Sequence, residues 1–244
     1  MNIALTVIVG TLIVLAIYIL AKHANNSRGY KLSIHQIAAQ RYVSQGRFEQ
    51  AKFEIERAIE KNPSDSLNYY ALGVIYYNLK EHNKALKNLK QAVLIDRNNW
   101  DAWFLMGRIY YERYDNEKAI KYFDKALCAN PSMIKAHFGL ASILFERGQI
   151  QEAAEHYRKI ISIEPMNANA HYNLGSCLIE EGRFREAIKE HEISAALDSE
   201  NPYAYYWVGY SYMQLNDKKR AAEAFAKSLQ RGYEGAAEAL KSLV

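Results

Sequence analysis

Histidine is the residue type in this sequence best suited to metal binding or acid–base chemistry. His35, His137 and His171 are separated by multiples of 34 residues, whereas a helical metal site places its ligands three or four residues apart. The same column of positions otherwise holds the aromatic residues Tyr69, Trp103 and Tyr205. We therefore expect these histidines to pack inside the fold and to bind no metal.

Two pairs of carboxylates could be considered for general acid–base catalysis, Glu152 with Glu155 and Glu180 with Glu181. Both pairs fall on expected helix surfaces, and nothing in the pattern around them implies a pocket. The sequence also lacks a glycine-rich phosphate loop, an H-E-x-x-H motif and a G-x-S-x-G nucleophile turn. We therefore expect a protein that is not an enzyme and needs no cofactor.

The two cysteines, Cys128 and Cys177, are too few for a disulfide framework and lack the C-x-x-C spacing of zinc or redox sites. A buried cysteine behaves as a small apolar side chain. We expect both thiols to be buried packing residues.

The formal net charge of +4 is concentrated at the N-terminus. Residues 1–31 contain Lys22, Arg28 and Lys31 and no acidic residue. Removing these three from the 31 basic residues leaves 28 basic against 27 acidic residues in the rest of the chain. Nucleic-acid-binding domains concentrate positive charge where they meet phosphates, so this balance argues against a nucleic-acid partner.

Small residues reveal an internal repeat of 34 residues without insertion or deletion. One column is Ala51, Ala85, Ala119, Ala153, Ala187 and Ala221. A second column, Ala39, Gly73, Gly107, Ala141, Gly175 and Gly209, precedes it, and a third of mostly larger side chains, Ile55, Leu89, Phe123, Tyr157, His191 and Phe225, follows it. Small residues let two antiparallel helices approach closely while larger ones fill the surrounding space, so each unit is expected to be a helix hairpin.

These columns resemble the tetratricopeptide-repeat (TPR) signature, W-x2-L-G-x2-Y, then A-x3-F, then P. The third unit matches it most fully, with Trp103, Met106, Gly107, Tyr110, Ala119, Phe123, Ala126 and Pro131. The resemblance implies an all-α right-handed α-α superhelix, a TPR solenoid of six hairpins plus a capping helix. The expected units are 32–65, 66–99, 100–133, 134–167, 168–201 and 202–235, with the cap at 236–244. His191 and Ser194 break the apolar pattern of the fifth unit, where we expect any local opening or bend.

Residues 3–21 form a stretch of uncharged, mostly aliphatic residues that spans about 28 Å as a helix, enough to cross a bilayer. The basic residues that follow it favour the cytoplasmic side. We expect a transmembrane anchor at 1–23, a flexible linker at 24–31 and a cytoplasmic solenoid at a membrane, of the bacterial inner-membrane type. The alternative is a cleaved signal peptide, which would require cleavage near Ala21.

In TPR proteins the first helices of the hairpins line a concave groove, and the resemblance implies the same here. The expected peptide-binding residues are Tyr70, Tyr77, Phe104, Arg108, Tyr111, Phe138, Phe145, Tyr172 and Tyr206. The adjoining column, Asn78, Glu112, Glu146, Glu180 and Gln214, would add an acidic row. Packing of the rings against the adjacent hairpin is the alternative interpretation. Arg108 is the only cation at positions where chaperone-binding TPR domains hold a carboxylate, so no such clamp is expected.

The expected function is that of a membrane-anchored adaptor that binds protein or peptide segments and helps to assemble or regulate a membrane-associated complex. The layout is similar to the membrane-anchored TPR protein of lipopolysaccharide assembly, but the cysteine-rich metal module of that family is missing. Two alternatives are a targeting or import receptor at a membrane and, if the N-terminus is cleaved, a periplasmic assembly factor for pili or secretion. Self-association is left open by the sequence.

Overall fold

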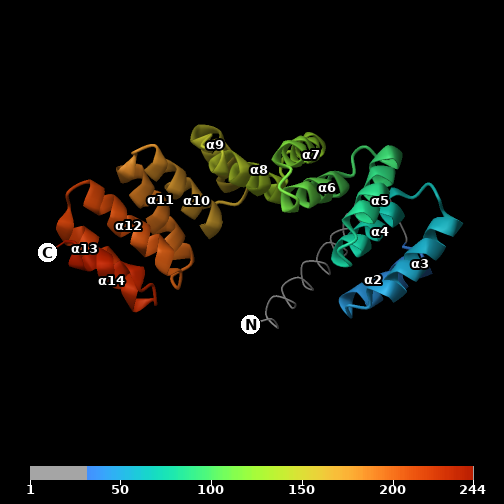
Figure 1. The fold of residues 1–244 in the computed structure, drawn as a ribbon, viewed down its shortest axis with the longest axis horizontal. Coiled ribbons are helices and arrows are strands. Elements are labelled where there is room, and N and C mark those ends of the chain that lie inside the picture. Colours follow the sequence, from blue (N-terminus) through green and yellow to red (C-terminus); the bar gives the residue numbers. More distant parts are fainter. Residues whose placement is uncertain (1–31, 244) are drawn as a thin grey trace. The chain divides into compact units, whose positions relative to one another are not determined.

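The computed structural model describes residues 32–243, which contain thirteen α-helices and no β-strand (Figure 1). The chain divides after Pro131 into two compact units. The first holds α2 (Ile34–Ser44), α3 (Phe48–Lys61), α4 (Ser66–Asn78), α5 (His82–Ile95), α6 (Trp100–Glu112) and α7 (Asn116–Ala129). The second holds α8 (Ile134–Glu146), α9 (Ile150–Ile163), α10 (Ala168–Glu180), α11 (Phe184–Leu197), α12 (Pro202–Gln214), α13 (Lys218–Gln230) and α14 (Gly235–Lys241).

The predicted anchor at 1–23 and linker at 24–31 lie outside the described residues. Among the helices of residues 32–243, none is both long enough and apolar enough to cross a membrane.

The small-residue columns form the crossing between the two helices of each hairpin. All six alanines of the first column, from Ala51 to Ala221, are fully buried. Each glycine of the second column lies against the large residue sixteen positions later. A Cβ atom added at Gly73, Gly107, Gly175 or Gly209 would lie 2.5–2.7 Å from the side chain of Leu89, Phe123, His191 or Phe225, respectively. Because Cβ atoms do not approach neighbours so closely, glycine is what permits these helix pairs to pack at this distance.

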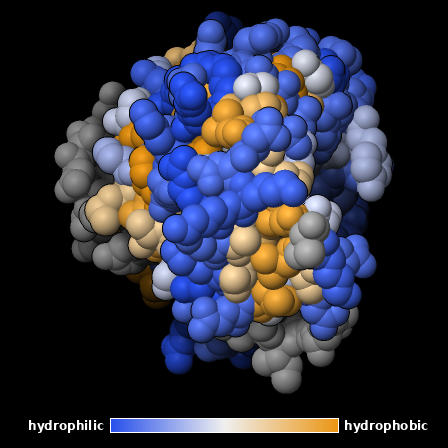
Figure 2. All heavy atoms as spheres, turned by 90° about the vertical axis from the view of Figure 1, so that its left-hand side faces the viewer, coloured by the Kyte–Doolittle hydropathy of each residue, from blue (hydrophilic) through white to orange (hydrophobic). Residues whose placement is uncertain are grey.

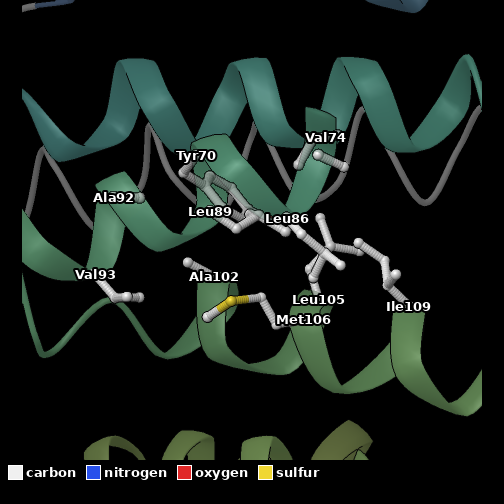
Figure 3. Packing of buried hydrophobic residues seen from close by; sticks show 11 residues of the cluster. Tyr70, Val74, Leu86, Leu89, Ala92, Val93, Ala102, Leu105, Met106 and Ile109 are labelled. Carbon is white, nitrogen blue, oxygen red and sulfur yellow. The ribbon is translucent and has the colours of Figure 1, made fainter. Parts of the chain in front are cut away.

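Neighbouring hairpins share an apolar core within each unit. Figure 3 shows the core of the first unit between α4, α5 and α6, where the ring of Tyr70 lies by Leu89 and Met106 lies beside Ala102. The hairpin pattern therefore buries one set of side chains inside each pair and another between consecutive pairs, as expected for a helical solenoid.

The turn inside each hairpin is as regular as the crossing. One residue per hairpin has a positive φ between 59° and 75°, namely Gly46, Lys80, Tyr114, Gly148, Gly182 and Asn216. In the third hairpin the N–H of Tyr114 donates to the carbonyl of Tyr111 (2.9 Å), and that of Asp115 donates to the carbonyl of Tyr110 (3.0 Å). The left-handed conformation costs roughly 1–2 kcal/mol for a residue with a side chain. Lys80 and Tyr114 therefore strain two of the turns.

The fifth hairpin keeps an unbroken second helix although polar residues replace apolar ones in its core. His191 is fully buried against Gly175, and its Nδ1–H donates to the carbonyl of Ala187 (3.0 Å). Its Nε2 atom and the Oγ atom of Ser194 have no hydrogen-bond partner among residues 32–243. Burial lowers the pKa of His191 to about 4, because the apolar site disfavours the imidazolium. This hairpin therefore contains buried polar atoms without partners, rather than a visible break.

The last hairpin is followed by a short helix, α14. Ala236 at its start is fully buried in a cluster with Ala221 and Phe225 of α13, and Leu240 packs against the same cluster. Figure 2 turns the side of the molecule where α12 to α14 lie towards the viewer, and hydrophobic patches interrupt a mainly hydrophilic surface there. α14 thus covers apolar surface that the sixth hairpin would otherwise expose.

We predict that Tyr114→Gly raises the free energy of unfolding by roughly 0.5–1 kcal/mol, because relief of the left-handed strain exceeds the added chain entropy. Tyr114 is 93% exposed, so few contacts are lost. Urea unfolding measures the change. The matched variant is Gly148→Ala, where the new Cβ meets no atom within 4 Å and only the backbone conformation is penalised. It should lower stability, and equal stability of both variants and the wild type would show that these turns hold no strain.

We predict that His191 makes the fold sensitive to acid. The folded-state pKa of about 4 lies below the ordinary value of 6.5, so the neutral form is favoured in the native state. This contribution is present above pH 6.5 and is lost as the pH falls towards 4. The wild type should therefore lose roughly 2 kcal/mol of stability between pH 7 and pH 5 through this residue.

The control for this pH dependence is His191→Phe, since phenylalanine faces glycine at the same position in the third and sixth hairpins. Urea unfolding at the two pH values should show a smaller acid loss in the variant. If the two proteins have the same pH dependence, His191 does not carry the effect.

Candidate functional site

Tyr70, one of the predicted groove residues, lies in the core of the first unit. Only 5% of its surface is exposed, and it belongs to the same buried cluster as Leu89 and Met106 (Figure 3). Burial raises the pKa of its hydroxyl well above the ordinary value. Tyr70 therefore packs, and its ring is not accessible to a ligand in this structure.

The other rings of this column share one arrangement across the two units. Each contacts the large residue that faces the glycine or alanine of its own hairpin. Ring centroids are 5.6 Å apart for Phe104 and Phe123, 5.9 Å for Phe138 and Tyr157, 5.4 Å for Tyr172 and His191, and 5.4 Å for Tyr206 and Phe225. Phe104, Phe138, Tyr172 and Tyr206 are all half-buried. One part of each ring thus packs within its hairpin, and another part remains accessible.

Tyr77 is the centre of a polar network in the first unit. Its hydroxyl donates to Glu112 Oε1, and Arg108 Nη2 donates to the Tyr77 hydroxyl oxygen at 2.7 Å. Arg108 also pairs with Glu112 at 3.4 Å, and the His82 ring stacks on Tyr77 with centroids 5.7 Å apart. Burial and the hydrogen bond to Glu112 raise the pKa of Tyr77 to about 12. At this point of the expected acidic row, Glu112 is already engaged by a tyrosine and an arginine.

Arg108 keeps 46% of its side chain exposed while its guanidinium lies over the Tyr77 ring, 5.1 Å from the centroid. A guanidinium has five N–H donors, and the contacts with Tyr77 and Glu112 do not occupy all of them. Tyr111 and Phe145, the remaining predicted groove residues, are half-buried. The first unit therefore presents half-buried rings beside the Arg108 guanidinium, and the Lys80 ammonium also lies over the Tyr77 ring, 5.7 Å from its centroid.

Four aromatic residues that were not in the predicted set join Tyr172 and Tyr206 in the second unit. Together they form what we call the C-terminal aromatic cluster: Tyr172, Tyr203, Tyr206, Trp207, Tyr210 and Tyr233. Four of its members follow the i, i+3, i+4, i+7 spacing of one face of α12. That spacing is visible in the sequence, but only in the sixth unit. Comparison of equivalent positions across the six repeats does not detect a pattern that occurs in a single repeat.

The histidine column lies inside the hairpins, where each member contacts the residue nineteen positions later. His35 and His171 place Nδ1 at 2.7 Å from Glu54 and Glu190, and His137 and His156 approach within 2.9 Å through their Nδ1 atoms. The three pairs belong to different hairpins. Within residues 32–243 no group of three or more His, Cys, Asp or Glu side chains could hold a metal ion.

The two cysteines differ in their surroundings. Cys177 is buried as expected, and burial raises the pKa of its thiol to about 12. Cys128 is exposed, so the expectation that both thiols are buried was wrong for this residue. Cys128 lies in the last turn of α7, on a helix face that residues 32–243 do not cover.

The hairpins and their half-buried inner rings define a helical repeat protein. Family models described as tetratricopeptide repeat match residues 32–65, 54–87, 100–132, 168–191 and 180–237, and one described as TPR repeat matches residues 141–178. These matches reach into every hairpin. The chain belongs to the tetratricopeptide-repeat family.

Solved structures share this fold at low sequence identity. YrrB, described as a TPR protein with an unusual peptide-binding site, has a TM-score of 0.69 at 23% identity, covering 77% of this chain and 97% of YrrB. PilF of Pseudomonas aeruginosa has a TM-score of 0.68 at 20% identity, covering 85% and 95%. MamA of Desulfovibrio magneticus RS-1 has a TM-score of 0.62 at 22% identity, covering 68% and 94%. These likenesses establish the fold alone, and a search of curated protein sequences finds no match.

Proposed function

We propose that this chain is a membrane-anchored TPR adaptor that binds peptide or protein segments through the inner rings of its hairpins and catalyses no reaction itself. The observation that carries the proposal is the arrangement of Phe104, Phe138, Tyr172 and Tyr206. Each is anchored to its own hairpin by a second ring and is still partly exposed. An accessible aromatic ring at the same position of several repeats favours a surface that a partner covers.

Rings held in this way suit recognition for an energetic reason. An aromatic side chain has few rotatable bonds, so binding costs little conformational entropy while a large apolar area is buried. Contact with Phe123 or Phe225 reduces that freedom further before any ligand arrives. A partner segment would therefore meet a surface that is already ordered.

Arg108 supplies a polar contact beside these rings in the first unit. Its guanidinium is held by Tyr77 and Glu112 and still has N–H donors to offer. We infer that it fixes the register of a bound segment by donating to a carbonyl or carboxylate oxygen of the ligand. The rings would then provide most of the binding energy.

Membrane attachment is the second part of the proposal. Residues 3–21 contain no charged side chain and are long enough to span a bilayer, and Lys22, Arg28 and Lys31 follow directly. We propose a single span with the repeats in the cytoplasm, of the bacterial inner-membrane type. Such an anchor would concentrate the partner at the membrane.

The proposal predicts site-dependent photocrosslinking in intact cells. A photoreactive phenylalanine analogue at Tyr111, on the inner face of α6, should trap one discrete partner, because this position would face the bound segment. The product should remain in the membrane fraction after alkaline extraction. Mass spectrometry of the trapped product identifies the partner.

The matched control places the same analogue at Tyr114, which lies in the turn of the same hairpin and is 93% exposed. It should give no discrete product. Equal products from both positions, or none from Tyr111, would contradict recognition by the inner rings. Release of the product by alkaline extraction would contradict the anchor.

A further inference from the structure

We propose that the C-terminal aromatic cluster binds an uncharged, proline-rich segment of a partner protein in the extended polyproline II conformation. The inference rests on the proposed adaptor function and names the chemistry of the ligand for the second unit. It depends on the packing, charge and hydrogen-bonding state of the cluster.

Three ring pairs of the cluster stand almost perpendicular, and the fourth, Tyr203 with Tyr233, is tilted at 56°. The interplanar angle is 78° between Tyr206 and Trp207, 79° between Trp207 and Tyr210, and 82° between Tyr206 and Tyr233, with centroids 5.0–5.4 Å apart. Tyr203 extends the row to Tyr233 at 5.1 Å. Partly exposed aromatic rings packed against one another are the kind of surface on which the rings of proline residues dock.

The orientation of this surface is fixed by contacts within the second unit. Trp207 Nε1–H donates to the hydroxyl of Tyr172 at 3.0 Å, which ties α12 to α10. Tyr206 rests on Phe225 of α13, with centroids 5.4 Å apart. A Cβ atom at Gly235 would lie 2.7 Å from the ring of Tyr233. The absence of a side chain at Gly235 therefore leaves room for Tyr233 at the end of the row.

Charge is absent from the whole of this helix. No residue from Asn201 to Asn216, which includes all of α12, is charged at neutral pH. On the other faces of α12, Arg231 covers Tyr205 at 4.3 Å and Arg220 covers Tyr212 at 4.6 Å. Within residues 32–243 no cation lies over a ring of the cluster. A strongly basic or acidic ligand would find no oppositely charged side chain on this helix.

The tyrosine hydroxyl groups of the cluster favour a ligand that offers hydrogen-bond acceptors. Those of Tyr203, Tyr206, Tyr210 and Tyr233 have no hydrogen-bond partner among residues 32–243. Burial raises the pKa of Tyr206, so its hydroxyl remains a protonated donor at neutral pH. A polyproline II segment has no internal hydrogen bonds and its prolines have no N–H, so it offers carbonyl acceptors that need donors. A helical ligand would already have satisfied most of its carbonyls.

The spacing of the row matches this ligand. Tyr203 and Tyr210 are seven residues apart on α12, about 10 Å along the helix axis. One turn of polyproline II contains three residues and rises about 9 Å. Two prolines three positions apart would therefore meet Tyr203 and Tyr210, the two ends of the row on α12. The ligand also enters with little entropy to lose, because it is extended before binding.

The test is calorimetric titration of the full-length chain with an oligoproline peptide of about ten residues, roughly three turns of polyproline II. A flexible Gly-Ser peptide of equal length is the control ligand. Saturable binding of the oligoproline and none of the control is expected. Trp207→Ala should weaken binding about tenfold or more, and the half-exposed Tyr203→Ala should also weaken it, even if the first variant folds poorly.

The matched control variant is Tyr205→Ala, which removes a ring from the covered face of the same helix and should leave the affinity within about twofold. No saturable binding, or equal loss in Tyr205→Ala and Tyr203→Ala, would overturn the proposal. Self-association that Tyr203→Ala abolishes would also overturn it, by assigning the cluster to a second copy of the chain. A partner trapped from Tyr111 would in either case leave the adaptor function standing.

Discussion

The close approach of two helices at a glycine or alanine is the constraint on which the rest of this structure depends. The alanine on the second helix is fully buried in every hairpin, and four glycines on the first helix lie so close to a large side chain that no Cβ would fit. A single hairpin cannot bury the side chains that surround such a crossing. Stacking of further hairpins, and of α14 on the last, follows from that need.

The same crossing positions the inner rings. Phe123 fills the space opposite Gly107 and carries Phe104 on its other side, and Phe225 does the same between Gly209 and Tyr206. The buried core and the half-buried rings are thus consecutive layers of one packing arrangement. A substitution at the crossing would therefore disturb these half-buried rings as well as the core. A polar ring is costly at this position. His191, which faces Gly175 in the fifth hairpin, has a buried Nε2 atom without a hydrogen-bond partner among residues 32–243.

Much of the fold could be predicted because spacing alone identifies a repeated hairpin, and the family and its helices are confirmed. The positive φ of Lys80 and Tyr114 was harder to predict, because neither residue type favours it. The sequence signal was the column itself, which holds Gly46, Gly148, Gly182 and Asn216 in the other hairpins. The candidate site was harder to predict, because a column of aromatic residues in the sequence does not show how much of each ring is buried and how much is exposed. Tyr70 is buried beside Leu89, whereas Tyr206 on Phe225 stays partly exposed. Tyr203 and Trp207 have no aromatic equivalents in the other units, so aligning the repeats hid them.

The central claim is that the inner rings are ordered by the hairpins and still open to solvent. Hydroxyl-radical footprinting of the folded full-length chain, read out by mass spectrometry, measures this directly. The account predicts oxidation of Phe104 and Tyr206 and protection of Phe123 and Phe225, the buried rings against which they pack. Equal protection of all four residues would mean that the inner face is closed core, and the account of a binding surface would then fail.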